Sequence, residues 1–213
     1  MLRRTVLLLT ALAFVIGLAP TGTTGVRGGD DETPGTLTIG IRDFCDPTTF
    51  NAVLGAGTCI RGDNVTVNGS TKFAGFGAEL GQEKSVGAWR FNPDRVNSDT
   101  EEGIVLTLVN RGGETHTFTR VAEFGGGFVA PLNAASGNPV PRPECARVLP
   151  NGSLTPQPPS ANNIFLIHGQ TVAGPRIIEE ENAKFQCCIQ PWMRTTFTEE
   201  DHNRGRDRGR KHH

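Results

Sequence analysis

Glycine and proline interrupt this chain so often that it has little room for long helices. The 213 residues include 27 Gly and 14 Pro, and the apolar stretches between them are short. Both residue types break regular elements and mark turns. The segment 36–41 alternates strictly between polar and apolar residues, as a half-buried strand does. The pattern predicts an all-β domain, an antiparallel sandwich of short strands.

The remaining segments fit this prediction. The apolar and Thr run 104–109 is continuous, which is typical of a strand buried on both faces. Residues 131–159 hold eight of the prolines and are expected to form a long irregular loop. Further strands are expected at 88–91, 115–121, 163–167, 170–178 and 183–189.

The N-terminus has the layout of a secretory signal peptide. Arg3 and Arg4 precede an apolar stretch, 5–18, which is shorter than the ~20 residues of a membrane span. We predict a signal peptide at 1–25, with cleavage near Ala19 or Gly25, and a secreted or periplasmic mature chain without an integral membrane span. The formal net charge is −1, which argues against a nucleic-acid partner. The basic segment 199–213 is expected to be a disordered tail.

Two segments resemble the copper-binding motifs of the cupredoxins, the blue-copper proteins. They are Asn-Arg-Gly-Gly-Glu-Thr-His-Thr-Phe at 110–118 and Lys-Phe-Gln-Cys-Cys-Ile-Gln-Pro-Trp-Met-Arg at 184–194. The resemblance covers 86–198 and is to secreted bacterial members of the plastocyanin and amicyanin kind. It implies a cupredoxin-like Greek-key β-sandwich over 26–198. Residues 36–85 would supply a first strand with an insertion, and the Pro/Gly-rich loop is an enlargement.

The resemblance also implies a metal site. His116 and Cys187 take the positions of an imidazole and a thiolate ligand, and Met193 that of the weak axial thioether. Gln190 stands where the family has its second histidine, and an amide oxygen is a harder and weaker donor for copper. The expected function is copper binding with one-electron transfer to a redox protein partner. The alternative is a metal-free β-sandwich that serves as a structural or interaction module. No enzyme motif is present, and an enzymatic activity is not expected.

A further histidine is a candidate for the vacant ligand position. If 170–178 and 183–189 form a hairpin about 179–182, Cys187 faces residue 174 and His168 lies near Met193. His168 is therefore a candidate substitute ligand, although a histidine before Gly169 also fits an ordinary surface turn.

The five cysteines suggest two disulfides and one ligand. The cysteines of exported proteins usually form disulfides, and Cys45 and Cys59 flank a short segment suited to a local disulfide. Side chains alternate along a strand, so Cys187 points into the core with Phe185 while Cys188 points away. We expect Cys188 to pair with Cys145 and Cys187 to remain free. A strained bridge between Cys187 and Cys188 is the competing arrangement.

Overall fold

The computed structural model describes residues 34–61, 70–98, 103–178 and 182–199. The signal peptide expected at 1–25 and most of the basic tail expected at 199–213 lie outside the described residues. No helix within them is long and apolar enough to cross a membrane.

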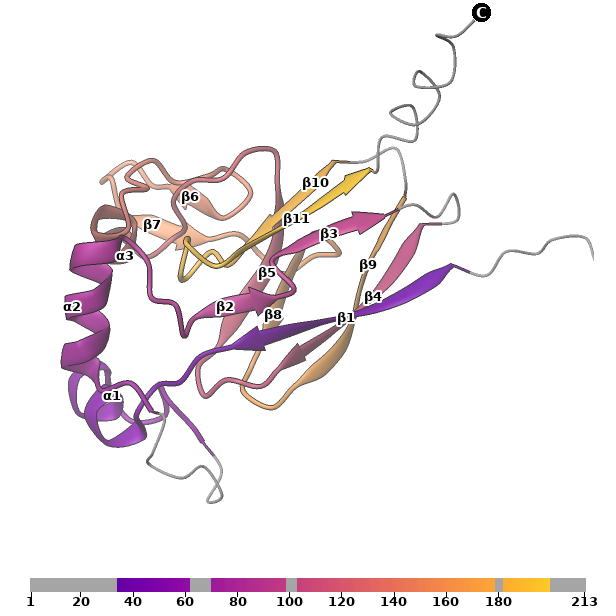
Figure 1. Cartoon of the computed structure of the whole chain (residues 1–213). Coiled ribbons are helices and arrows are strands. Elements are labelled where there is room, and N and C mark those ends of the chain that lie inside the picture. The colour runs from indigo at the N-terminus through magenta and orange to yellow at the C-terminus, as the bar shows by residue number, and fades with distance from the viewer. Residues whose placement is uncertain (1–33, 62–69, 99–102, 179–181, 200–213) are drawn as a thin grey trace, which may run out of the picture. The chain divides into compact units, whose positions relative to one another are not determined.

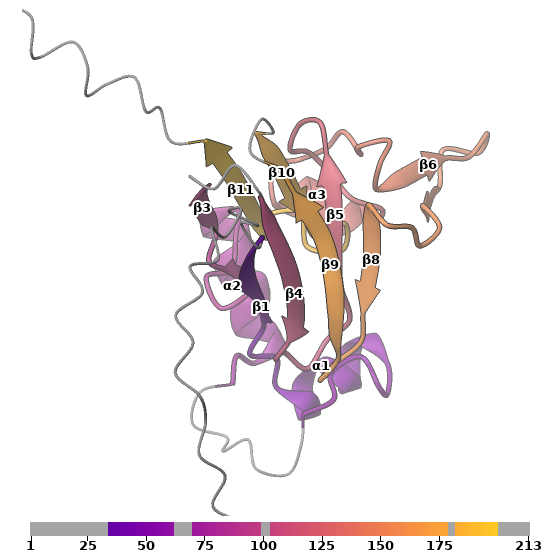
Figure 2. The same cartoon turned by 90° about the vertical axis from the view of Figure 1, so that its right-hand side faces the viewer.

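The strands form two main sheets (Figures 1 and 2). The first has the order β2-β1-β4-β9, built from β1 (Gly35–Arg42), β2 (Arg90–Asn92), β4 (Ile104–Asn110) and β9 (Thr171–Ile177). The second has the order β3-β11-β10-β5-β8, built from β3 (Arg95–Ser98), β5 (His116–Val121), β8 (Asn163–Leu166), β10 (Ala183–Gln186) and β11 (Arg194–Glu199). The predicted β-sandwich is confirmed.

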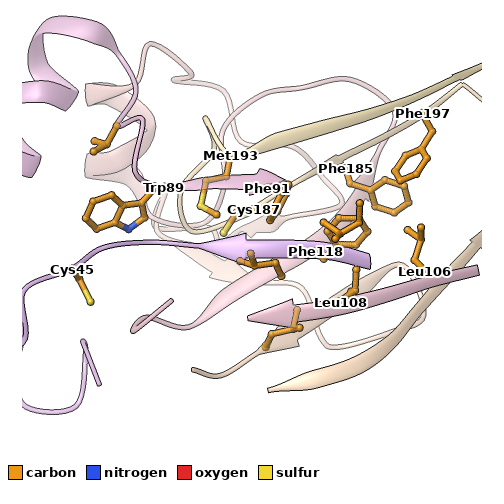
Figure 3. Packing of buried hydrophobic residues seen from close by; sticks show 14 of the residues in the cluster. Cys45, Trp89, Phe91, Leu106, Leu108, Phe118, Phe185, Cys187, Met193 and Phe197 are labelled. Carbon is orange, nitrogen blue, oxygen red and sulfur yellow. The ribbon is translucent and has the colours of Figure 1, made fainter. Parts of the chain in front are cut away.

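The core lies between the two sheets and is rich in phenylalanine (Figure 3). Phe118 of β5 stacks on Phe185 of β10 with ring centroids 4.4 Å apart, and Phe91 of the first sheet meets Phe118 at 5.3 Å. Leu106 and Leu108 of β4 close the same core from the first sheet. This rigid packing fixes β5 and β10, the two strands that carry the candidate ligands, against each other.

Strand β4 is buried on one face rather than on both. Leu106 and Leu108 are inaccessible to solvent, whereas Val105 is 37% exposed. The prediction of a doubly buried strand was wrong because the outer face of the first sheet carries apolar side chains without being fully covered. A continuous apolar run cannot distinguish these two situations.

The sheets are mixed, which corrects the prediction of a purely antiparallel sandwich. β1 runs parallel to β4, with Leu37 opposite Leu106, and β11 runs parallel to β3, with Phe197 opposite Val96. Alternation within one strand fixes which side chains face the core, but it carries no information on the direction of the neighbouring strand.

The expected hairpin between 170–178 and 183–189 does not form. β9 pairs with β4 in the first sheet, while β10 pairs with β5 and β11 in the second. A Cβ atom at Gly174 would lie 2.8 Å from Leu106, so this residue packs on β4 and does not face Cys187. Two successive strands can pair edge to edge or pack in opposite sheets, and period-two patterning fits both.

The insertion after β1 contains two helices, which were not predicted. Helix α1 (Pro47–Leu54) begins with a capped turn, in which the Thr49 N–H donates to Asp46 Oδ1 at 2.8 Å. Helix α2 (Phe73–Glu83) turns Phe76 and Leu80 inward. An Asp followed by a Pro is a common helix start, and this signal was present in the sequence.

The enlarged loop is partly regular. It contains a short helix, α3 (Ala130–Ala135), and a two-stranded hairpin of β6 (Ala146–Val148) and β7 (Leu154–Pro156). A disulfide between Cys145 and Cys188 ties the loop to the end of β10. The loop is thereby held beside the segment that carries the candidate ligands.

Candidate metal centre

The two motifs meet where β5 begins and β10 ends. His116 is the first residue of β5, and Cys187 directly follows β10. The two strands are antiparallel neighbours, so these ends lie side by side. Thr117 joins them: its N–H donates to Cys187 Sγ at 3.4 Å, and its hydroxyl accepts from the Cys188 N–H at 2.7 Å.

Residues 187–193 form a short loop that folds back on itself. The Cys187 N–H donates to the Met193 carbonyl and the Met193 N–H to the Gln190 carbonyl, each at 3.0 Å. The Gln190 N–H points at Cys187 Sγ at 3.5 Å. Cys187, Gln190 and Met193 are each at most 3% exposed. Figure 3 shows the sulfur-bearing side chains of Cys187 and Met193 at the same end of the core.

Three polar atoms of this site surround a common point. Cys187 Sγ lies 3.0 Å from Gln190 Oε1 and 3.8 Å from His116 Nδ1, and Nδ1 lies 3.1 Å from Oε1. In this arrangement Gln190 Oε1 accepts hydrogen bonds from the thiol and from the imidazole. The structure therefore brings together His116, Cys187 and Gln190 and places Met193 in the loop that carries two of them.

Asp43, a residue not identified from the sequence, completes the site. Its Oδ2 contacts His116 Nε2 at 2.9 Å, on the side of the ring opposite Cys187. The carboxylate also accepts the backbone N–H groups of Cys45 at 3.2 Å, Gly113 at 2.9 Å and Glu114 at 3.0 Å. Asp43 lies just after β1, where no motif singles out one acidic residue among many.

The electrostatics of the site favour charged groups despite its burial. Burial alone lowers the pKa of His116, but its hydrogen bonds to Asp43 and Cys187 outweigh this and raise the pKa to about 10. Burial raises the pKa of Asp43, and the hydrogen bond and charge of His116 more than reverse that shift, so its pKa is lowered. The pKa of Cys187 is likewise lowered, because the contact with His116 exceeds the effect of burial. The contacts with Asp43 and Cys187 therefore favour the charged form of the buried imidazole.

The donor atoms fit a metal ion of the kind implied by the sequence. An ion at the centre of the Sγ, Nδ1 and Oε1 triangle would lie about 2 Å from each atom, close to usual metal–ligand bond lengths. A carboxylate on the far nitrogen of a ligand histidine is the common support for such a ring. Within the described residues no three His, Cys, Asp and Glu side chains form a metal-binding group. A metal here therefore depends on the Gln190 amide and the Met193 thioether as well.

His168 lies elsewhere. It is half-buried in the turn between β8 and β9, in a pocket with Arg61, Arg111 and Gly112. The neighbours of Cys187 Sγ are His116, Gln190 and Thr117, so the structure does not bring His168 to the candidate ligands. Its predicted placement near Met193 depended on the hairpin that does not form.

The structure forms both disulfides expected from the sequence. Cys45 is bonded to Cys59 and Cys145 to Cys188, while Cys187 is free and buried. Cys187 lies in the main core, whereas Cys188 belongs to a separate small cluster with Cys145 and Val121. The alternation expected along β10 therefore separates the two adjacent cysteines, and the competing Cys187–Cys188 bridge is not present.

A buried carboxyl group lies next to the site. Trp89 Nε1 donates to Glu114 Oε2 at 2.5 Å, and Glu114 is 7% exposed. Burial raises the pKa of Glu114 to about 7 in spite of this hydrogen bond. Trp89 in turn stacks against Phe50 of α1 and contacts Phe76 of α2, so the helical insertion packs onto this end of the sandwich.

Comparison with known proteins gives a distant likeness in structure. No family model and no curated protein matches the sequence. Among solved structures, the chain is similar to a purple cupredoxin from Nitrosopumilus maritimus, with 13% sequence identity and a TM-score of 0.33. The match covers 76% of this chain and 98% of that one.

Proposed function

We propose that this protein is an exported copper-binding protein that transfers single electrons and has no enzymatic activity. The observation that supports this most directly is the convergence of Cys187 Sγ, His116 Nδ1 and Gln190 Oε1 within 3.8 Å of one another. Two disulfides are consistent with an oxidising compartment and with the signal peptide predicted at 1–25.

Each residue of the site would have a separate task. Cys187 supplies the only free thiol among the described residues, and its lowered pKa favours the thiolate that soft metals require. Asp43 holds the His116 ring by Nε2 and leaves Nδ1 directed at Cys187. The hydrogen bonds that close the loop 187–193 would hold Gln190 and Met193 in place. Bound copper would supply the one-electron chemistry.

Gln190 makes the site different from one with two imidazoles. Its amide oxygen is a hard donor, so the softest atoms of the site are the two sulfur atoms. A site with a thiolate, a thioether and one imidazole favours Cu(I), which accepts low coordination numbers and prefers sulfur. We therefore expect the parent protein to bind Cu(I) more tightly than Cu(II).

Competition titrations with Cu(I) and Cu(II) test this proposal. To exclude binding by the tail, all proteins carry His202, His212 and His213 changed to Ala. Cys187→Ser should abolish Cu(I) binding, and His116→Ala should weaken it less. His168→Ala is the control, because it removes an imidazole that lies away from the site. Equal affinity of the parent and Cys187→Ser would refute copper binding at this site.

A gain of function complements these losses. Gln190→His supplies a second imidazole and should strengthen Cu(II) binding, with the intense absorption of a thiolate-to-copper charge transfer. A variant that stays colourless and binds no more Cu(II) than the parent would show that the loop does not hold its side chains in ligand positions.

A metal-free structural or interaction module is the second candidate. One observation favours it: in the structure, Cys187, His116, Gln190 and Asp43 satisfy one another by hydrogen bonds, and none needs a further partner. Under this function the same titrations give no binding that depends on Cys187.

A further inference from the structure

A small basic pocket lies at the end of the sandwich where β4 and β8 end. Its volume is about 180 Å³, and it is lined by Ile60, Arg61, Asn110, Arg111, Gly112, His168 and Gly169. The lining contains two arginines and a histidine and no acidic residue. In Figure 2 the ends of β4 and β8 lie at the lower end of the molecule, beside α1.

The three basic residues come from segments far apart in the sequence, and each segment is anchored. Arg61 follows Cys59, which is held by its disulfide, and the Ile60 N–H donates to the Gly113 carbonyl at 2.7 Å. The Arg111 N–H donates to the Ile41 carbonyl at 2.8 Å. His168 lies in a tight turn in which the Gln170 side chain accepts from the Ile167 N–H at 3.0 Å. The pocket is thus preformed, which reduces the entropic cost of binding.

No carboxylate among the described residues lines this pocket, and Asp43, which packs behind Gly112, is paired with His116. Among residues 34–61, 70–98, 103–178 and 182–199, neither arginine forms an ion pair and His168 contacts no acid. The Arg61 guanidinium lies over the Phe44 ring, 5.4 Å from its centroid, and makes one long contact of 3.5 Å to the Cys45 carbonyl. Arg111 is exposed to solvent. Most of their N–H donors therefore make no hydrogen bond within the described residues.

We propose that Arg61, Arg111 and His168 bind the carboxylate group of an anionic ligand in this pocket. Guanidinium groups match the two oxygens of a carboxylate, and charge-assisted hydrogen bonds of this kind are among the strongest in proteins. Ile60 and Ile167 are 43% and 57% exposed beside the pocket, so a ligand with an apolar body can also cover apolar surface. The carboxylate comes from a free small molecule or from an acidic segment of another protein.

The pocket is separated from the candidate metal centre by one residue. A Cβ atom on Gly112 would overlap Asp43 Oδ2, which contacts His116. Only a residue without a side chain lets the pocket wall pack this closely on the buried carboxylate. A ligand in the pocket would therefore lie one backbone segment away from the Asp43–His116 pair, although the proposed binding does not depend on copper.

Titration of the metal-free, full-length protein at low ionic strength tests the proposal, with amide resonances as the readout. Two probes distinguish the sources: citrate represents a free carboxylate and a hexaglutamate peptide an acidic segment. Binding of either should shift the Gly112 and Gly169 amides saturably. Arg111→Gln should weaken binding about tenfold, since it removes a charged hydrogen-bond donor. Arg111 is exposed and its anchoring contact uses the backbone, so this variant should fold.

Arg147→Gln is the matched control, because it removes one exposed arginine from β6 and leaves the pocket intact. It should bind both probes as the parent does, and Arg61→Gln should resemble Arg111→Gln if it folds. The proposal is overturned if neither probe shifts the pocket amides. It is also overturned if Arg147→Gln weakens binding as much as Arg111→Gln, because the attraction would then be general rather than local.

Discussion

Replacing Asp43 by alanine should destabilise the domain more than any other change of a single carboxylate in the described residues. The side chain is 1% exposed and accepts four hydrogen bonds, three from backbone N–H groups and one from His116. Asp43→Ala leaves all four donors without an acceptor in a region that water does not reach. It also leaves His116 without its counter-charge.

The expected loss follows from these contacts. A buried donor without a partner costs about 1–3 kcal/mol, and removal of one member of a buried ion pair costs about 3–5 kcal/mol. These costs overlap, because the freed donors can shift towards one another, so we expect a loss of about 4 kcal/mol. With a urea m-value of about 2 kcal/mol/M, the unfolding midpoint should fall by about 2 M.

The pH dependence of this loss has a defined sign. The pKa of Asp43 is lowered by folding from 3.8, so its contribution is present above that value and is lost as the pH falls further. The pKa of His116 is raised from 6.5 to about 10, so its contribution is complete below pH 6.5 and is lost towards pH 10. The difference between parent and Asp43→Ala should therefore be largest between about pH 4 and pH 6.5.

Urea unfolding of the disulfide-bonded protein at pH 5.5 and at pH 9.5 measures both effects. Asp46→Ala is the matched control, since Asp46 belongs to the same loop but bonds to Thr49 at the start of helix α1 and not to His116. Asp46→Ala should lower the urea midpoint less than Asp43→Ala does. Its effect should also be the same at pH 5.5 and at pH 9.5. If Asp43→Ala unfolds at the same urea concentration as Asp46→Ala, Asp43 does not carry the buried network described above.

Three further results are expected. Alkylation should leave Cys187 unmodified in the folded protein and modify it alone after unfolding without reduction, and mass mapping that finds Cys187 in a disulfide would contradict the structure. Folding raises the pKa of Glu114 from 4.5 to about 7, so the parent should lose up to about 3 kcal/mol of stability as the pH rises through this range. Glu114→Gln should remove this loss when thermal unfolding at pH 5 and at pH 8 is compared. Gly112→Ala should cost about 1–3 kcal/mol and shift the His116 ring resonances, because its Cβ would overlap Asp43; unchanged resonances would mean that the backbone gives way elsewhere.

The sequence was most informative where a motif and a periodic pattern acted together. The spacing of Cys187, Gln190 and Met193 placed three side chains on one loop, and alternation with Phe185 decided which of two adjacent cysteines faces the core. Both inferences need only short-range geometry. The pairing of Cys188 with Cys145 then followed from the odd number of cysteines, and the structure contains it.

Features that depend on long-range packing could not be predicted in this way. Asp43 reaches His116 across 73 positions because the end of β1 lies near the start of β5, and no local pattern records this. The parallel pairing of β1 with β4 likewise depends on a crossover through the helical insertion. The position of His168 was predicted wrongly for the same reason, because β9 and β10 are adjacent in sequence but lie in different sheets.

The adjacent cysteines at the end of β10 make the chemistry of this protein depend on strand register. A slip of one residue in β10 would exchange the faces of all its side chains. Cys188 would then enter the core beside His116, and Cys187 would be the partner offered to Cys145. The exchanged molecule would have the same number of disulfides and the same mass, so oxidation during folding could fix it as a covalent isomer. The register of β10 against β5 therefore decides which of the two cysteines lies in the core and which is bonded to Cys145.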